Sequence, residues 1–249
     1  MIKFEIKNQT GILTLNRPEK RNALHPEMIK QVKEKLEQIK DSDSIKSLII
    51  TGAGKAFCAG ADLVYLNKLK DYSSIENEED SRMLAEMYMN IYQFPKPTIA
   101  AVNGAAIAGG CGLATVCDII IADSEHAKFG YSEVKIGFVP AIVSYFLLIR
   151  IGVALAKELL LSAKILNANE AYEIILVNQL SNNVLQKSLE LTDSINKNSL
   201  TSVILTKKMI LNITNLSLEE AVAYCLKLNT LSRSTEDFAV GLNNFLTKK

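Results

Sequence analysis

The sequence has 249 residues, 48% of them hydrophobic, which is enough chain and enough apolar surface for a substantial folded core. Its 28 Lys+Arg residues and 27 Asp+Glu residues leave a net charge of +1, so no excess positive field exists to hold a nucleic acid or an anionic membrane. The longest apolar run, residues 138–149, is well short of the roughly 20 residues that a membrane-spanning helix needs. The N-terminus lacks the basic-then-apolar pattern of a signal peptide, so we expect a cytoplasmic protein.

The first part of the chain alternates short apolar segments with helical patterns. Residues 3–6 and 11–15 predict a β-hairpin, and the apolar spacing after Pro26 predicts a helix. Further strands are predicted over residues 47–50, 98–102 and 118–122, and helices over 81–92 and 109–116. This alternation is typical of β-α-β units, so we predict an α/β fold with a largely parallel sheet covered on its faces.

The last third of the chain has a helical pattern throughout. Asn167 and Glu170 have the spacing of a capping box, which predicts a helix start. Other helices are predicted over residues 153–162, 184–197, 201–211, 218–231 and 238–246. The acidic segment 68–80 lacks strong periodicity and predicts a mobile loop or frayed helix. We expect an α/β core over residues 1–190 and a helical C-terminal region over 191–249.

The histidines and cysteines do not favour a metal site or a disulfide. The four cysteines, at positions 58, 111, 117 and 225, follow no ligand spacing. His25 precedes a proline and His126 lies in a polar turn, positions that suit a surface or capping role. Any acid/base chemistry is therefore expected from carboxylates.

Two glycine-rich turns follow predicted strands, at residues 55–63 and 103–113. Each can leave backbone N–H groups free at the start of a helix, where a negative oxygen is favoured. Together the turns could form an oxyanion hole, while close backbone packing is the other explanation for their glycines. Neither turn matches a dinucleotide or phosphate-loop pattern, which removes the main support for hydride transfer and nucleotide hydrolysis.

Several segments, in the same order along the chain, closely resemble the enoyl-CoA hydratase/isomerase (crotonase) family. They are residues 16–24 (NRPEKRNAL), 55–63 (KAFCAGADL), 98–104 (TIAAVNG), 108–114 (AGGCGLA), 117–118 (CD), 129–137 (FGYSEVKIG) and 235–246. The resemblance covers essentially the whole chain. It implies a crotonase-like spiral of ββα units with a helical C-terminal trimerisation region, and hence a homotrimer or hexamer. It also implies an acyl-CoA thioester substrate and no separate cofactor, because coenzyme A is part of that substrate.

The same resemblance implies roles for particular residues. The backbone N–H groups of Ala61 and Gly109 would bind the thioester oxygen as it becomes an enolate, and Glu133 would be the catalytic acid/base. Positions implied to bind the substrate are Ala59, Asp62, Gly110, Gly112 and Tyr131. Asp62 also has a position suited to holding the loop backbone, and Arg17, Lys20 and Lys55 are candidates for contacts with coenzyme A phosphates.

The sequence departs from typical hydratases at Gly112, where they carry a first glutamate, so Glu133 is the one expected carboxylate present. Methylglutaconyl-CoA hydratase-like members resemble this chain in that glycine and in residues 137–143 (GFVPAIV). A substrate carboxylate or an acid from residues 76–80 would then replace the missing group. Gly112 would either leave room for a bulky acyl chain or adopt a positive φ. We expect Gly112→Glu to increase hydration of a short straight-chain enoyl-CoA.

We therefore expect a lyase of lipid metabolism that adds water to, or removes it from, a 2-enoyl-CoA thioester. Two alternatives remain open. A double-bond isomerase needs only one base to take a proton from one carbon and return it to another. A catalytically weak acyl-CoA-binding protein would account for the glycine at position 112.

Overall fold

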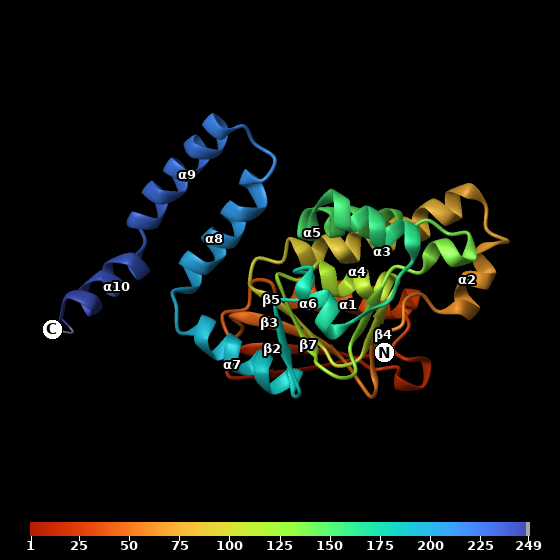
Figure 1. The fold of residues 1–249 in the computed structure, drawn as a ribbon. Helices are drawn as coiled ribbons and strands as arrows, with labels where there is room; N and C mark the ends of the chain where they lie inside the picture. Colours follow the sequence, from red (N-terminus) through yellow and green to blue (C-terminus); the bar gives the residue numbers. More distant parts are fainter. Residues whose placement is uncertain (248–249) are drawn as a thin grey trace.

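The computed structural model describes residues 1–247. The protein contains two sheets, and the larger one has six strands (Figure 1). Its strand order is β1-β2-β3-β5-β7-β10, with β1 antiparallel to β2 and the other neighbours parallel. The strands are β1 (Ile2–Lys7), β2 (Thr10–Leu15), β3 (Ser47–Gly52), β5 (Thr98–Val102), β7 (Ile119–Asp123) and β10 (Gln179–Ser181). The predicted hairpin and the three predicted buried strands are confirmed; β10 was not predicted.

The second sheet is smaller and was not predicted. It consists of β4 (Ala56–Cys58), β6 (Ala105–Ile107), β8 (Lys128–Gly130) and β9 (Leu166–Asn167) in that order. β4, β6 and β8 run parallel, and β9 is antiparallel to β8. Strands of two or three residues are too short to show a period of two in the sequence. Because parallel strands share one carboxyl edge, the turns after β4, β6 and β8 lie along the same edge of this sheet.

Helices surround the sheets and account for most of the remaining chain. They are α1 (Pro26–Ile39), α2 (Leu63–Leu69), α3 (Ser74–Tyr92), α4 (Gly109–Thr115), α5 (Ala141–Ser162), α6 (Ala168–Glu173), α7 (Val184–Asn196), α8 (Leu200–Ile213), α9 (Leu218–Arg233) and α10 (Glu236–Thr247), with 3-10 turns η1 (Pro18–Lys20) and η2 (Glu133–Ile136). His25 caps α1 by accepting a hydrogen bond from the Glu27 amide, as expected. The predicted capping box of Asn167 and Glu170 is also present.

Two helical segments differ from the prediction. The acidic segment, expected to be a mobile loop or a frayed helix, is mostly regular helix, because Ser73 and Glu76 form a capping box that starts α3 at Ser74. α5 begins at Ala141, earlier than predicted, and consists of two helical stretches joined at Gly152, whose φ of 77° interrupts the helical backbone. The sequence pattern therefore identified only the stretch after this glycine.

Both faces of the large sheet are covered, which explains why its strands are continuous apolar runs rather than alternating ones. Leu48 and Ile50 of β3 belong to the main core, which also includes residues of α1, α3, α4 and α5. Ile49 points to the opposite face, where it packs with Val184 and Leu189 of α7. Residue 190, the boundary expected between core and C-terminal region, lies inside α7.

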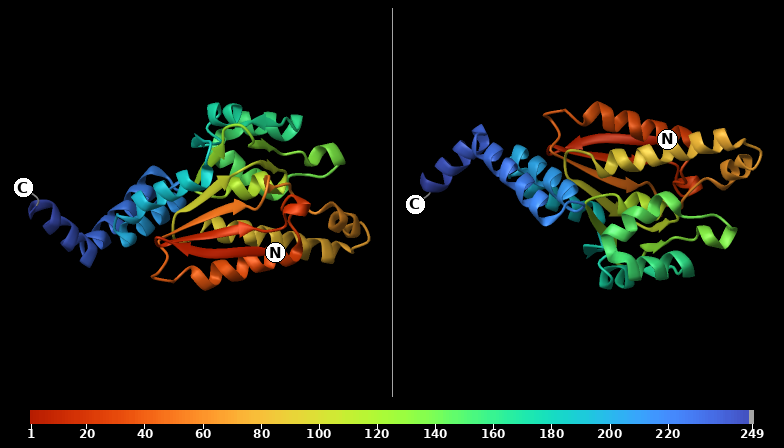
Figure 2. Two further views of the ribbon diagram at one scale, coloured as in Figure 1. Left: turned by 90° about the horizontal axis from the view of Figure 1, so that it is seen from below. Right: turned by 90° about the horizontal axis from the view of Figure 1, so that it is seen from above.

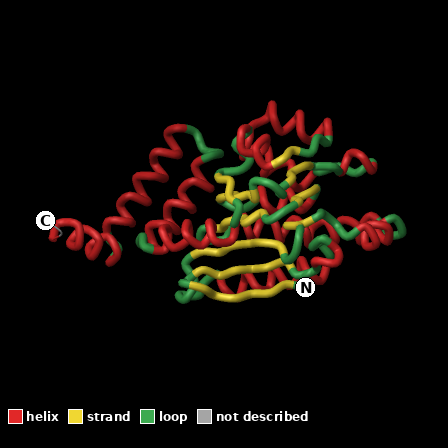
Figure 3. The backbone as a smooth tube through the Cα atoms, turned by 60° about the horizontal axis from the view of Figure 1, so that its bottom comes forward, coloured by secondary structure: helices red, strands yellow, loops and turns green. Residues whose placement is uncertain are grey.

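The chain beyond β10 is helical, and α8, α9 and α10 extend away from the sheets (Figures 2 and 3). Lys207 is the buried residue of α8, and α9 and α10 contain no buried residue within the described part of the chain. Across residues 1–247, none of the helices combines the length and the apolar character needed to span a bilayer.

Candidate active site

The turns that follow β4, β6 and β8 meet at one edge of the small sheet. The strand registers place Cys58 beside Ala106, and Ile107 beside Gly130. The Ala108 amide donates a 2.7 Å hydrogen bond to the Gly130 carbonyl, which joins the second turn to the third. A Cβ atom on Gly60 would lie 3.7 Å from the Gly109 nitrogen, so the first and second turns are also in contact. The topology thus brings together the three turns that carry Ala61, Gly109 and Glu133.

The first turn is held by the N-terminal segment. The Leu24 amide donates to the Gly60 carbonyl at 2.7 Å, and the Asp62 amide donates to the Leu24 carbonyl at 2.9 Å. The Ala61 amide lies between these bonds and has no hydrogen-bond acceptor within residues 1–247, and the residue is partly exposed. Gly60 adopts a φ of 92°, a conformation that glycine accepts without a steric cost. The amide of Ala61 is therefore free to bind a ligand.

Asp62 is engaged within the protein. Its carboxylate caps α2 by accepting from the Val64 amide at 3.0 Å and forms a 2.8 Å ion pair with Arg17. The Arg17 guanidinium holds the pKa of Asp62 below its usual range. Arg17 also donates to the Ala23 carbonyl at 2.8 Å. This pair fastens the first turn to the N-terminal segment, in line with the expected role of Asp62 in holding the loop.

The second turn contains a strained residue directly before Gly109. Ala108 has a φ of 51° and a ψ of −126°, a combination that costs about 1–3 kcal/mol for a residue with a side chain. Its carbonyl accepts from the Cys111 and Gly112 amides at 2.9 and 3.1 Å. Gly109 begins α4 and is partly exposed, and its amide likewise has no acceptor in the part of the chain described. A Cβ on Gly110 would lie 2.0 Å from the Cys58 carbonyl oxygen, so α4 packs directly on β4.

Gly112 is explained by packing. Gly112 lies inside α4 and does not have a positive φ, so the prediction that its backbone needs a positive φ is wrong. A Cβ on Gly112 would lie 2.1 Å from Cγ1 of Val143, a buried residue of α5 that fills the space beside the glycine. This space is not left open for an acyl chain. Gly112→Glu would also clash with Val143, so the expected gain in hydration does not follow from that substitution alone.

Glu133 is the carboxylate closest in sequence to the third turn and begins η2. Its side chain is buried, with 8% of the residue exposed, and Oε2 has no hydrogen-bond partner among the described residues. This burial raises the pKa of Glu133, since desolvation disfavours the charged form. A buried carboxyl with an unsatisfied oxygen and a raised pKa has the properties of a general acid/base.

Three of the other predicted substrate-binding residues differ in how accessible they are. Ala59 is partly exposed and its amide donates to the Arg21 carbonyl at 3.0 Å. Gly110 is buried against β4, as described above. Tyr131 is completely buried, and its hydroxyl lies 2.8 Å from that of Thr115. The completely buried side chain of Tyr131 therefore makes its contacts inside the protein and does not present a surface to a substrate.

The acids of residues 76–80 have structural partners. Glu76 completes the capping box of α3, and Asp80 accepts a hydrogen bond from the Tyr65 hydroxyl. Glu78 and Glu79 both pair with Arg82 on the same helix. The structure thus provides no support for the hypothesis that one of them replaces the carboxylate absent at Gly112.

Tyr88 of α3 was missed by sequence reasoning. It is completely buried, and its hydroxyl donates a 2.7 Å hydrogen bond to the Gly109 carbonyl. Burial raises its pKa. A buried aromatic residue on a helix looks in sequence like any core residue, so no local signal could have identified this contact.

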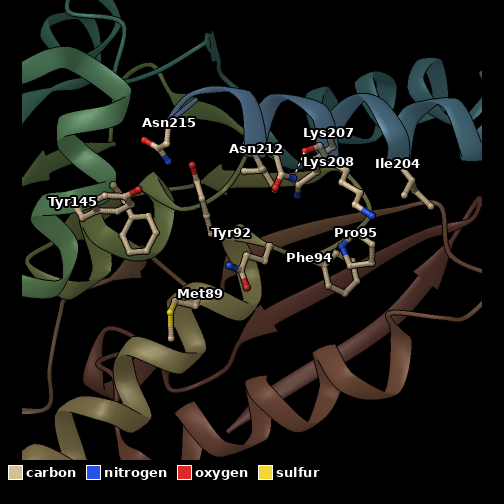
Figure 4. Close-up of a pocket in the computed structure, with 13 residues that line it drawn as sticks. Met89, Tyr92, Phe94, Pro95, Tyr145, Ile204, Lys207, Lys208, Asn212 and Asn215 are labelled. Carbon is tan, nitrogen blue, oxygen red and sulfur yellow. Dashed lines mark hydrogen bonds between the residues drawn. The ribbon is translucent and has the colours of Figure 1, made fainter. Parts of the chain in front are cut away.

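A cavity of about 530 Å³ lies between α3, α5 and α8, and no residue of the turns lines it (Figure 4). Its lining includes Tyr92, Tyr145, Lys208 and Asn212, and contains none of Ala61, Gly109 and Glu133. At its edge, Lys207 forms a 2.6 Å ion pair with Asp118. Among residues 1–247, no group of three or more His, Cys, Asp or Glu side chains is placed to hold a metal ion. The turns, rather than this cavity, carry the acid/base group.

Comparisons with known proteins identify the family of this chain. A sequence model of the enoyl-CoA hydratase/isomerase family matches residues 5–249. The chain is 38% identical over 251 residues to a Thermus thermophilus protein assigned as an enoyl-CoA hydratase, covering 100% of this chain and 98% of that protein. It is 32% identical over 250 residues to the short-chain-enoyl-CoA hydratase of Clostridium acetobutylicum, covering 99% of this chain and 94% of that protein.

A solved structure is similar over the same length. The crystal structure of an enoyl-CoA hydratase from Polaromonas superposes with a TM-score of 0.95 at 31% identity, covering 100% of this chain and 97% of that one. The α/β fold with its crotonase-like architecture, expected from the sequence motifs, is thereby confirmed. Since these likenesses extend along essentially the whole chain, the protein belongs to the enoyl-CoA hydratase/isomerase family.

Proposed function

We propose that this enzyme adds water to the double bond of a 2-enoyl-CoA thioester, with Glu133 as acid/base and Ala61 and Gly109 as oxyanion donors. The observation that carries the proposal is a buried carboxyl with an unpartnered oxygen, set at the sheet edge where two free amides also lie. The hydratase relatives support water addition as the reaction.

The chemistry follows from where charge develops. When a water oxygen bonds to C3 of the enoyl group, the electrons of the C2–C3 double bond move toward the thioester, whose oxygen becomes an enolate oxygen. Two backbone N–H groups aimed at that oxygen stabilise it, and losing one such donor typically costs about 2.7–4 kcal/mol. Glu133 takes the proton from the attacking water and returns a proton to C2, which completes the addition of one water molecule.

The raised pKa of Glu133 suits both halves of this task. A carboxyl whose pKa is shifted toward neutral pH is a stronger base than an ordinary glutamate and still accessible as an acid. The absence of a second carboxylate at Gly112 means that one group carries both proton transfers. This is also the feature that keeps double-bond isomerisation as the second candidate, because that reaction needs one base.

Exposed apolar side chains adjoin the site and suit an acyl group. Leu63 and Val64 follow Asp62 directly in α2 and are 72% and 65% exposed. Ile136, Phe138 and Val139 follow Glu133 closely and are all more than half exposed. In this proposal the acyl chain lies among these residues, coenzyme A enters as part of the substrate, and no separate cofactor takes part.

The proposal extends to assembly and to cellular role. Exposed apolar residues along α9 and α10, such as Leu226 and Phe245, support a homotrimer or a pair of trimers in which these helices are covered by other copies. We place the enzyme in lipid metabolism in the cytoplasm, on the basis of the acyl-CoA chemistry and the character of the N-terminal sequence.

The test is a panel of enoyl-CoA esters with straight, branched and carboxylated acyl groups. Hydration of 2-enoyl esters is followed by loss of the conjugated absorbance, and migration of the double bond is followed from the 3-enoyl esters. Hydration of at least one ester is the expected result. Migration without hydration would replace the proposal by the isomerase, and binding of every ester without turnover would replace it by an acyl-CoA-binding protein.

A further inference from the structure

Tyr88 makes an unusual connection between the core and the second glycine turn. It lies on α3, 21 residues before Gly109 in the sequence, and donates a 2.7 Å hydrogen bond to the Gly109 carbonyl. The phenol is completely buried, and the raised pKa keeps its proton in place across the working pH range. The hydroxyl is therefore a permanent donor to one backbone atom of the turn.

The same hydroxyl also leaves no room for a side chain at position 109. A Cβ on Gly109 would lie 2.9 Å from the Tyr88 oxygen, closer than real contacts of this kind. Tyr88 thus bonds to the Gly109 carbonyl and also occupies the space that a side chain at position 109 would need. A rotation of the peptide unit that follows Gly109 would move its carbonyl and break this hydrogen bond.

The turn needs an external support because the residue before Gly109 is strained. Ala108 has a positive φ and a ψ of −126°, and a strained backbone persists only where its surroundings hold it. On one side, the Ala108 amide is fixed by the Gly130 carbonyl. On the other side, the Gly109 carbonyl is fixed by Tyr88. The amide of Gly109 lies between these two attachments, and the Ala108 carbonyl of the same peptide unit accepts from the Cys111 and Gly112 amides, so these contacts together set its direction.

We propose that Tyr88 is a positioning residue of the oxyanion site: its hydroxyl holds the strained Ala108–Gly109 backbone so that the Gly109 amide points at the thioester oxygen. The inference rests on the proposed function, because it assumes that the Gly109 amide binds that oxygen. Tyr88 itself, being completely buried, does not touch the substrate. Its effect should therefore appear in the stabilisation of the enolate and not in the binding of the ground-state ester.

The first experiment compares Tyr88→Phe with Tyr92→Phe. Tyr92 lies one turn further along α3, and its hydroxyl makes no hydrogen bond within the described chain, so it controls for loss of a phenol from this helix. We expect Tyr88→Phe to lower kcat about tenfold, equal to about 1.4 kcal/mol, with KM for crotonyl-CoA changed less than about twofold. Tyr92→Phe should keep wild-type values. Wild-type kcat in Tyr88→Phe, or a loss confined to KM, would overturn the inference.

A binding measurement separates this inference from the proposed function. Acetoacetyl-CoA can bind as an enolate, with negative charge on its oxygens, whereas butyryl-CoA cannot. The ratio of their dissociation constants does not depend on the fraction of protein that is folded. We expect the wild type to prefer acetoacetyl-CoA and Tyr88→Phe to lose about tenfold of that preference. No preference in the wild type contradicts the oxyanion site itself, and a preference that persists in Tyr88→Phe contradicts only the role of Tyr88.

A third variant tests whether the support acts through the strained residue. Glycine accepts the Ala108 conformation without a steric cost, so Ala108→Gly should relax the turn. In the Ala108→Gly background, removal of the Tyr88 hydroxyl should then lower kcat less than it does in the wild type. An equal loss in both backgrounds would show that Tyr88 does not act by holding this backbone.

Discussion

The sheet region buries its apolar side chains, whereas the C-terminal helices leave side chains of the same kinds exposed. Leu48, Ile49 and Ile50 of β3 are each at most 1% exposed, and both faces of their sheet are covered by the chain itself. In α10, Phe245 is 81% exposed and Leu246 is 61% exposed. The sheet region completes its own core, whereas the last three helices leave an apolar surface that their own chain does not cover.

The attachment between the two regions differs from the packing inside either one. Lys207, the buried residue of α8, forms an ion pair with Asp118 and donates to the Lys96 carbonyl at 3.1 Å. Asp118 in turn accepts from the Thr98 amide and hydroxyl at the start of β5. A polar anchor of this kind fixes where α8 joins the sheet without burying α9 and α10. Chemistry in the sheet region and assembly through the helices should therefore respond to different mutations.

Glu133→Gln tests the chemistry of the sheet region and should have the largest effect. The amide keeps the shape of the carboxyl but cannot exchange a proton, so kcat should fall by about two to four orders of magnitude. Steady-state hydration of the preferred enoyl-CoA measures the loss, and the molar mass in light scattering should stay that of the wild type. Glu5→Gln, an exposed site on β1, is the matched control. Retention of wild-type turnover would remove Glu133 from the mechanism.

Val222→Glu/Leu226→Glu tests the opposite region. These residues lie four apart on α9 and are 50% and 63% exposed, so in the proposed trimer they meet another copy. Burying two charges at such a contact is unfavourable, and we expect the mass in light scattering to fall from three copies to one. Lys30→Glu on α1 lowers the net charge by the same two units, because a positive side chain becomes negative, and it should leave the mass unchanged.

The circular dichroism of this double variant should stay close to that of the wild type, because α9 contributes no buried residue to the sheet region. A wild type that is itself a monomer at low concentration would refute the proposed assembly. Unfolding of the sheet region in the double variant would show that the two regions are not independent.

Gly112→Glu tests how tightly the sheet region is packed around the site. The substitution places side-chain atoms where Val143 lies, and overpacking of this kind costs about 1–3 kcal/mol of unfolding free energy. Val143→Gly removes the obstacle, so Gly112→Glu/Val143→Gly should regain stability relative to Gly112→Glu. With two carboxylates able to orient a water, it should also hydrate crotonyl-CoA faster than Val143→Gly alone. Denaturant unfolding and steady-state rates of all three variants measure this.

If Gly112→Glu alone is as stable as the wild type, the close contact with Val143 does not limit this position. If the double variant is stable but gains no hydration over Val143→Gly, then the missing carboxylate is not what limits turnover. That second outcome would favour the isomerase.

The pH dependence of stability should show the smallest effect. Burial raises the pKa of Glu133 in the folded state above its ordinary value of 4.5. The protonated side chain is therefore favoured by folding, and its contribution to the free energy of unfolding is fully present below pH 4.5. This contribution is lost as the pH rises through the folded-state pKa. Glutamine at this position does not titrate. Glu133→Gln should therefore gain stability relative to the wild type as pH rises from 4.5, and the gain should level off at higher pH. The free energies of unfolding of both proteins are measured with urea at several pH values. If the difference between Glu133→Gln and the wild type stays constant with pH, Glu133 is not a buried carboxyl with a raised pKa.

The elements that could be predicted from the sequence are those with a strong local signal. The buried strands around Ile49, Ile99 and Ile120 are runs of apolar residues, and the helix at Ala168 begins with a capping box that is complete within four residues. Both glycine-rich turns could be identified because each follows a predicted strand. The family motifs also pointed to Glu133 before any distance was known.

The tertiary structure alone decided how those pieces become a site. Strands of two or three residues carry no period, so the small sheet that places Ala61, Gly109 and Glu133 on one edge has no sequence signature. The contacts of Tyr88 with Gly109 and of Val143 with the space beside Gly112 join residues more than 20 positions apart. Propensity, periodicity and capping depend on neighbours within a few residues, whereas these contacts depend on how whole helices pack against the sheet, and only folding brings them together.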